Sequence, residues 1–206
     1  MAEFFRIHPD TPSDRQILKV VEVAENDGVI VYPTDSVYGI GCSLNSKKGV
    51  QRIAQFKGIK VKQAEFSLLF SDIDQISEFT KPLEKWVFRL LKKNLPGPFT
   101  FILHASNKLP KILEASRKTI GIRIPDNNIV REIVRQLGAP LLNTSVHDDD
   151  EIIEFTTDPE LIYDNYKNIF DVIINGGYGK NEPSTVVDCT GDEPEILRQG
   201  IGELEF

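Results

Sequence analysis

Residues 28–42, GVIVYPTDSVYGIGC, are the stretch of sequence that decides the fold. The β-branched and aromatic residues of Val29–Tyr32 predict a strand that is buried on both faces. Pro33 has no backbone N–H and therefore ends the strand, so Thr34–Ser36 follows at its carboxyl end. Ligands of open α/β sheets bind at that end of the strands. The stretch therefore predicts a binding site, and the alternative is a polar turn between two core strands.

The segments around this stretch alternate between strand and helix. Tyr38–Cys42 predicts a second, short strand, in which Gly39 and Gly41 allow a close backbone approach or a positive φ. Apolar spacing and capping residues predict helices between residues 13 and 28 and over 46–57, 72–79, 82–94, 127–137 and 159–166. Further strands are expected over 66–70, 99–103, 119–124, 141–143, 171–175, 184–189 and 195–198. This alternation predicts one α/β domain over residues 1–206, with a twisted sheet of parallel and antiparallel strands and helices packed outside.

Length and composition narrow the class of protein. With 206 residues, of which 40% are hydrophobic and 27% charged, the chain can bury one core without a disulfide or a metal. No apolar run approaches the roughly 18–20 residues of a membrane span, and residues 1–12, MAEFFRIHPDTP, lack the apolar segment of a signal peptide. Cys42 and Cys189 have no metal-ligand spacing, so we expect two reduced core thiols. These features predict a cytoplasmic protein without a membrane partner.

Charge is distributed unevenly along the chain, although the net charge is -7. Ser36–Ala64 contains six cations and no acid, and Lys85–Arg123 contains nine cations and one acid. Asp148–Phe206 contains sixteen acids and three cations. The first two-thirds of the chain therefore predict a site for a polyanion, while the last third keeps the molecule acidic. For most individual lysines, a solvated helix face is the alternative.

Small hydroxyl residues and cations recur at predicted strand ends and turns. No Walker A loop, HExxH, GxSxG or dinucleotide-binding glycine motif is present. The hydroxyl residues are Thr34, Ser36, Thr100, Thr119, Thr144, Ser145, Ser184 and Thr185, and the cations are Lys57, Lys60, Arg123 and Arg198. Hydroxyls and cations together suit phosphate and carboxylate ligands, because both ligands offer negatively charged oxygen acceptors.

Seven motifs, in order, resemble the YrdC-like family, the threonylcarbamoyl-adenylate synthases. They are YPTDSVYGIG (32–41), Lys57-Gly58, LPGPFTFIL (95–103), TIGIRIP (119–125), NTSV (143–146), PSTVVD (183–188) and ILRQGIG (196–202). These core motifs span about residues 13–202, and the opening HPDTPSDRQI (8–17) is similar to the YciO-type branch. The resemblance implies a YrdC-like fold whose sheet surrounds a basic cavity, in agreement with the uneven charge.

The resemblance also implies a reaction. Such an enzyme is a nucleotidyltransferase that forms threonylcarbamoyl-AMP and pyrophosphate from L-threonine, bicarbonate and ATP, for threonylcarbamoyladenosine modification of tRNA. Catalysis of this kind is mainly positioning and charge neutralisation. Mg²⁺ is the expected cofactor, held by phosphates and water without a protein motif. Two alternatives stay open: an RNA-binding protein of the same fold, for double-stranded RNA or tRNA, and adenylyl transfer to another carbamate. The sequence does not decide the oligomeric state.

The resemblance assigns roles to individual residues. Lys57 and Arg123 are expected to be catalytic, with Arg123 binding the carboxylate of L-threonine. The L-threonine site is expected to comprise Thr34, Arg123, Ser184 and Thr185. The nucleotide site is expected to comprise Lys57, Lys60, Thr119, Ser145, Val146 and Arg198. Further positions within the matching motifs are Ser36, Tyr38, Lys62, Thr100, Thr144 and His147.

The chain departs from the family pattern in three places. Ile59 stands where the K-x-R element has arginine, and Lys60 and Lys62 are the cations that could take its place, although lysine is not equivalent to arginine at a bidentate site. His147 stands where the family's Ser-Ala-Asn has asparagine. The acidic run Asp148–Glu151 follows, and we expect it to be a solvated loop, with a metal-assisting role as the alternative.

Overall fold

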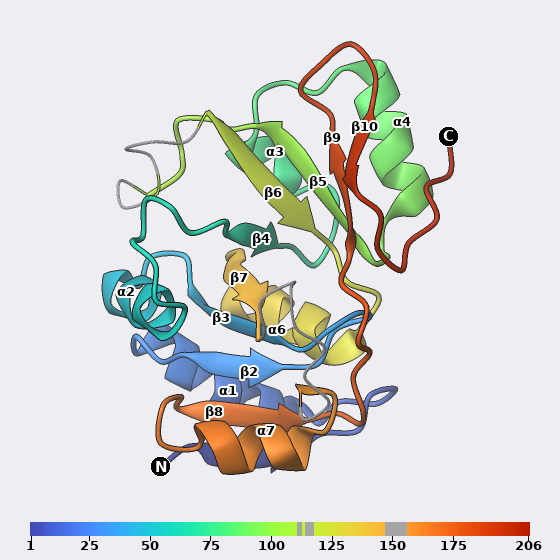
Figure 1. Cartoon of the computed structure of the whole chain (residues 1–206). Helices are drawn as coiled ribbons and strands as arrows, with labels where there is room; N and C mark the ends of the chain where they lie inside the picture. Colours follow the sequence, from blue (N-terminus) through green and yellow to red (C-terminus); the bar gives the residue numbers. More distant parts are fainter. Residues whose placement is uncertain (111–112, 114–117, 147–155) are drawn as a thin grey trace.

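The computed structural model describes residues 1–110, 113, 118–146 and 156–206. Within these residues, ten strands form one sheet in the order β1-β8-β2-β3-β7-β4-β6-β5-β9-β10 (Figure 1). The strands are β1 (Glu3–Arg6), β2 (Ile30–Tyr32), β3 (Gly39–Ser43), β4 (Ser67–Leu69), β5 (Phe99–His104), β6 (Thr119–Arg123), β7 (Leu141–Ser145), β8 (Val172–Asn175), β9 (Thr185–Asp188) and β10 (Glu195–Arg198). The sheet contains four parallel pairs (β1–β8, β2–β8, β4–β6 and β5–β9) and five antiparallel ones, which confirms the predicted mixed sheet.

Helices cover both faces of the sheet. They are α1 (Asp14–Glu25), α2 (Lys47–Phe56), α3 (Ile76–Phe79), α4 (Lys85–Asn94), α6 (Asn128–Leu137) and α7 (Pro159–Tyr166). The apolar residues of α1 and α6 pack into one core cluster, and those of α2, α3, α4 and α7 pack into a second, larger cluster. Figure 1 shows α1 and α6 together behind the part of the sheet that contains β2, β3 and β7. The expectation of helices packed outside the sheet is confirmed.

Strand β2 lies between the two core clusters. Ile30 and Tyr32 face the α1/α6 cluster, whereas Val29 and Val31 face the other one. All four side chains are fully buried, as the sequence predicted for a strand covered on both faces. The strand pairs with β8 on one side and β3 on the other, and it ends before Pro33. Its carboxyl end therefore delivers the next loop to the edge of the core.

One strand was missed in the sequence, and two other expectations can be compared with the structure. The N-terminal strand β1 was not predicted; it pairs in parallel with β8, which is more than 160 residues away in the sequence. Gly39 and Gly41 serve close approach and not a positive φ, because the glycines with positive φ are Gly58, Gly138 and Gly177. Cys42 and Cys189 are free and buried, as expected.

Among the described residues, no helix combines the length and the apolar character that a membrane span requires.

Candidate functional site

The loop after β2 is closed by its own side chains. The Thr34 hydroxyl donates to the Val37 carbonyl oxygen at 2.7 Å and accepts a hydrogen bond from the Ser36 backbone N–H at 3.0 Å. The hydroxyl oxygens of Thr34 and Ser36 lie 3.2 Å apart, and both residues are buried. Threonine hydroxyls stabilise turns in this way. The loop therefore holds its shape through its own hydrogen bonds and presents Asp35 and Ser36 to the carboxyl end of β6.

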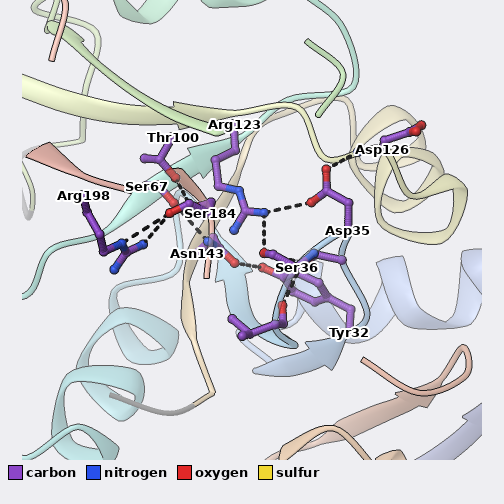
Figure 2. A network of polar contacts seen from close by, with 12 residues as sticks. Tyr32, Asp35, Ser36, Ser67, Thr100, Arg123, Asp126, Asn143, Ser184 and Arg198 are labelled. Carbon is purple, nitrogen blue, oxygen red and sulfur yellow. Dashed lines mark hydrogen bonds and ion pairs between the residues drawn. The ribbon is translucent and has the colours of Figure 1, made fainter. Parts of the chain in front are cut away.

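Arg123, the last residue of β6, meets this loop. Its Nη2 donates to Asp35 Oδ1 and to Ser36 Oγ, both at 3.0 Å (Figure 2). The side chains of Arg123 and Asp35 are only 5% and 9% exposed. Burial lowers the pKa of Arg123, and the charge of Asp35 acts in the opposite direction. The Arg123 Nε atom is buried, and within residues 1–110, 113, 118–146 and 156–206 it has no hydrogen-bond partner. The guanidinium therefore has a donor available for a group that the protein does not supply.

A pair of hydroxyls and a second arginine lie beside Arg123. Ser184 Oγ and Thr100 Oγ1 are 2.8 Å apart, and the Nε and Nη2 atoms of Arg198 donate to the Ser184 carbonyl oxygen at 3.3 and 3.0 Å. The charge of Arg198 further lowers the pKa of Arg123, so the two cations share one electrostatic environment. Figure 2 shows these groups converging on Arg123 from the side opposite Asp35. The structure thus brings together two arginines and two hydroxyls that suit an anionic ligand.

Two hydroxyls predicted for the site bind the protein itself. Thr185 Oγ1 donates to the Gly202 carbonyl oxygen at 2.6 Å and accepts from the Gly200 N–H at 3.0 Å. The Tyr38 hydroxyl donates to the Gly177 carbonyl oxygen at 2.7 Å. Both side chains are fully buried. In this structure they hold the loops that border the site.

A buried polar chain that the sequence analysis missed lies beside Arg123. The Tyr32 hydroxyl donates to Asn143 Oδ1 at 2.8 Å, and Asn143 Nδ2 donates to Ser67 Oγ at 3.0 Å. Burial raises the pKa of Tyr32 well above its ordinary value, so it stays a neutral donor. The available signals were local: Tyr32 and Asn143 each begin a motif that resembles the family, and Asp35 lies between two of the predicted site residues.

Thr119 and Arg123 share one face of β6. Side chains alternate along a strand, so residues two and four positions apart point the same way. The two residues are nevertheless at opposite ends of β6, which corresponds to about 13 Å along the strand. No hydrogen bond within the described residues joins Thr119 to Arg123.

The residues predicted on β7 have three different environments. Ser145 pairs with Gly39 on β3 and has the same orientation as Asn143, whereas Thr144 points to the opposite face of the sheet. Val146 is buried, and its backbone N–H donates to the Tyr38 carbonyl oxygen at 3.0 Å. Their predicted contacts with a nucleotide stay predictions. His147 and Asp148–Glu151 lie outside the described residues.

The predicted phosphate-binding lysines follow α2. Lys57 is partly buried at the end of that helix, and Lys60 and Lys62 are exposed in the loop that leads to β4. Among the described residues, no hydrogen bond or ion pair joins Lys60 or Lys62 to the Arg123 cluster. Ile59 is 41% exposed, so it is a surface residue and not part of the core.

Two surface hollows lie away from this cluster. One, of about 360 Å³, is lined by Ser77, Leu83, Lys85, Phe88 and Arg89. The other, of about 440 Å³, lies between α1, Arg52 and Asp171. Neither is the basic cavity expected from the sequence, which stays a prediction.

The sequence of the chain is similar to those of several known proteins. A family model for Sua5, YciO and YrdC proteins, with the description "Telomere recombination", matches residues 22–200. The chain is 40% identical over 207 residues to the Escherichia coli K12 protein YciO, covering 100% of this chain and 98% of that protein. It is 27% identical over 189 residues to the threonylcarbamoyl-AMP synthase of Bacillus subtilis 168, covering 91% of this chain and 54% of the synthase.

Solved structures show the same fold. The crystal structure of E. coli YciO superposes with a TM-score of 0.90 at 40% identity, covering 98% of both chains. The crystal structure of P. abyssi Sua5 complexed with L-threonine superposes with a TM-score of 0.87 at 22% identity, covering 97% of this chain and 58% of the other. The fold is therefore that of YciO and of the corresponding part of Sua5.

Proposed function

Because the chain belongs to the Sua5/YciO/YrdC family, in its YciO-type branch, we propose that it is a nucleotidyltransferase that forms threonylcarbamoyl-AMP and pyrophosphate from L-threonine, bicarbonate and ATP. The product would serve threonylcarbamoyladenosine modification of tRNA. The family includes threonylcarbamoyl-AMP synthases, such as the B. subtilis protein. The observation that carries the proposal is the buried guanidinium of Arg123, whose Nε has no hydrogen-bond partner in the described part of the chain.

Arg123 would bind the carboxylate of L-threonine. An arginine donor that is buried without a partner is unfavourable unless a ligand accepts its hydrogen bond. A carboxylate suits this donor, because its charged oxygens form strong hydrogen bonds with a guanidinium N–H. Thr34, Ser184 and Thr185 would complete the L-threonine site, and the carbonyl oxygen of Ser184 accepts a hydrogen bond from Arg198. The P. abyssi Sua5 complex with L-threonine supports this class of substrate.

ATP would bind beside L-threonine, with its phosphates near cations. Arg198 lies next to Ser184 and faces the same space as Arg123 (Figure 2). We assign the remaining nucleotide contacts to Lys57, Lys60, Thr119, Ser145 and Val146. The role of all these groups would be to hold the carbamate and the α-phosphorus in line and to neutralise charge as pyrophosphate leaves.

Mg²⁺ would bind mainly through the phosphates of ATP. The described residues contain no group of three or more His, Cys, Asp or Glu side chains that would hold a metal by themselves. The carboxylate in the site, Asp35, already accepts hydrogen bonds at both oxygens. The oxygen donors that remain there are the neutral hydroxyls of Thr100 and Ser184, which fit an ion that keeps its phosphate and water ligands. When bound, the ion supplies charge neutralisation on the phosphates.

Pyrophosphate release tests this function directly. The protein is incubated with ATP and Mg²⁺, with and without L-threonine and bicarbonate, and pyrophosphate is measured. We expect release that requires both. The variant Arg123→Lys keeps the charge but loses the fork, and we expect it to lose activity; Arg89→Lys, on the exposed surface of α4, is the matched control and should retain it.

The same assay separates the alternatives. Release that requires bicarbonate and a different amine in place of L-threonine would favour adenylyl transfer to another carbamate. No release under any condition, in a protein that is folded, would contradict a synthase and favour the RNA-binding hypothesis.

One observation supports RNA binding as a second candidate function. Lys85, Arg89 and Lys92 lie on one exposed face of α4, and in the described residues none of them has an ion-pair partner. Phe88, which is 46% exposed, lies between them. Cations beside an exposed aromatic ring suit phosphates and a base.

Titration with RNA over a range of salt concentrations tests this candidate. When a protein binds RNA through its phosphates, the logarithm of the binding constant decreases linearly with the logarithm of the salt concentration. The double variant K85E/R89E should reduce the affinity for single-stranded or double-stranded RNA and flatten that slope. Equal affinity of the variant and the wild type would exclude this face of α4 as the binding surface.

A further inference from the structure

The carboxylate of Asp35 is held from two directions. Its Oδ1 accepts a hydrogen bond from Arg123 Nη2 at 3.0 Å, and its Oδ2 accepts one from the backbone N–H of Asp126 at 2.8 Å. Asp126 belongs to the loop that follows β6, so both donors come from the same strand end. The side chain of Asp35 is 9% exposed. With both oxygens engaged in a buried setting, the carboxylate has little freedom to rotate.

The guanidinium of Arg123 is in turn held at one nitrogen. Nη2 binds Asp35 and, at 3.0 Å, also Ser36 Oγ. Nε is buried and has no hydrogen-bond partner among the residues that the structure describes. Two acceptors on Nη2 fix the plane of the guanidinium, and Figure 2 shows Arg123 between Asp35 on one side and Ser184, Thr100 and Arg198 on the other. The Nε–H is therefore kept in a defined orientation.

We propose that Asp35 is a positioning residue, which holds the Arg123 guanidinium so that its Nε–H can donate a hydrogen bond to the carboxylate of an amino-acid substrate. This inference rests on the proposed function and adds to it a residue that binds no substrate itself. Asp35 also supplies the counter-charge that allows Arg123 to stay buried while the site is empty. The competing explanation is structural: Asp35 only joins the loop after β2 to the loop after β6.

Asp171, whose side chain is 38% exposed, offers a control with the same kinds of partner elsewhere in the fold. Its Oδ2 accepts from Arg52 Nη1 at 2.6 Å and from the Val29 backbone N–H at 2.7 Å. It therefore makes the same two kinds of contact, an arginine and a backbone amide, between segments that are distant in the sequence. None of its partners belongs to the Arg123 cluster. Asp35→Asn and Asp171→Asn should each weaken a structural tie, but only Asp35→Asn should change the site.

The first experiment needs no ligand. Arginine side-chain NMR of the whole protein reports how freely each guanidinium rotates, and Arg123→Lys identifies the Arg123 signals. We expect Arg123 to be rotationally restrained in the wild type and in Asp171→Asn, and to rotate freely in Asp35→Asn. Asp35→Glu keeps the charge and should recover part of the restraint. If Asp35→Asn folds and the rotation of its Arg123 guanidinium is as restrained as in the wild type, the proposal is overturned. If Asp35→Asn does not fold, Asp35→Glu takes its place, and full wild-type restraint in that variant overturns the proposal.

The second experiment measures binding of L-threonine and of L-threoninamide, which lacks the carboxylate, by calorimetry. We expect Asp35→Asn to weaken the binding of L-threonine at least about tenfold, which is about 1.4 kcal/mol. The same variant should leave the affinity for L-threoninamide unchanged. The control Asp171→Asn should bind both ligands as the wild type does. Equal losses for both ligands would show a structural role and overturn the proposal. If the wild type binds no L-threonine, the proposed function fails, and the NMR experiment alone decides whether Asp35 positions Arg123.

Discussion

Arg123 and Asp35, 88 residues apart in the sequence, form an ion pair of 3.0 Å with both side chains almost fully buried. The sequence predicted a ligand carboxylate as the partner of Arg123, and the structure adds a carboxylate of the protein. Arg123 therefore contributes to the stability of the empty protein as well as to the candidate site.

The first prediction concerns this ion pair. Arg123→Ala should destabilise the protein without ligand by about 3–5 kcal/mol, because Asp35 is left buried without its counter-charge. Chemical denaturation measures this change. If a ligand were the only partner of Arg123, the same variant would leave the stability of the empty protein unchanged.

A double-mutant cycle provides the control. Arg123→Ala combined with Asp35→Ala should cost less than the sum of the two single variants, because the double variant leaves no unpaired charge. Strictly additive losses, or an unchanged stability of Arg123→Ala, would contradict the pair as the source of the effect.

Much of the fold could be predicted because its elements carry strong local patterns. α7 and β10 were predicted at their observed bounds, 159–166 and 195–198. The helix after Ser46 begins as expected, and the Ser46 hydroxyl accepts a hydrogen bond from the Gly49 N–H. β1 was missed because four residues carry too little periodicity, and its place in the sheet comes from pairing with β8.

The candidate site was predicted as a set of residue types and not as a geometry. Ser36, Thr100, Arg123, Ser184 and Arg198 lie close together in the structure (Figure 2), and Thr34 contacts Ser36. The roles of Asp35 and Asn143 could not be predicted, because a buried polar side chain is defined by its partner. Asn143 binds Tyr32, which is 111 residues away, and neither local pattern indicates this contact.

The second prediction concerns the space around that polar chain. A Cβ on Gly39 would lie 2.7 Å from Asn143 Oδ1 and 2.7 Å from a ring carbon of Tyr32. Gly39→Ala should therefore destabilise the protein by about 1–3 kcal/mol through overpacking. The matched control is Gly191→Ala, because a Cβ there would have its nearest neighbour at 3.8 Å. Thermal denaturation measures the stability of both variants. Equal stability of the two would show that the side chains of Tyr32 and Asn143 move to make room for the new Cβ.

The third prediction concerns the two thiols. Burial, followed by the charge of a neighbouring aspartate, raises the pKa of Cys42 and of Cys189 from 9.0 to about 12. Both should therefore resist alkylation by iodoacetamide at pH 8 in the folded protein and react after unfolding. Mass spectrometry counts the labelled thiols. Labelling of the native protein at the rate of the unfolded chain would contradict their burial.

The same shifts set a pH dependence. A thiol whose pKa is raised by folding is neutral in the folded protein over a range in which the unfolded chain has already lost the proton. Its contribution to stability is therefore complete below pH 9 and decreases between pH 9 and about pH 12. Cys42→Ala should reduce the slope of the unfolding free energy over that range, and a slope equal to that of the wild type would contradict the assignment to Cys42.

The fourth prediction concerns Ile59, where the resemblance to the family predicts an arginine. Its side chain is 41% exposed, so Ile59→Arg should change stability by no more than about 0.5 kcal/mol. If the phosphates of ATP bind near Lys57, the guanidinium of the introduced arginine should donate hydrogen bonds to them. The KM for ATP should then decrease about tenfold, as expected for hydrogen bonds to a charged group. Gln63→Arg adds the same charge to an exposed position six residues from Lys57 and serves as the control. An equal effect of both variants would indicate general attraction of the nucleotide, and no effect of Ile59→Arg would place the phosphates elsewhere.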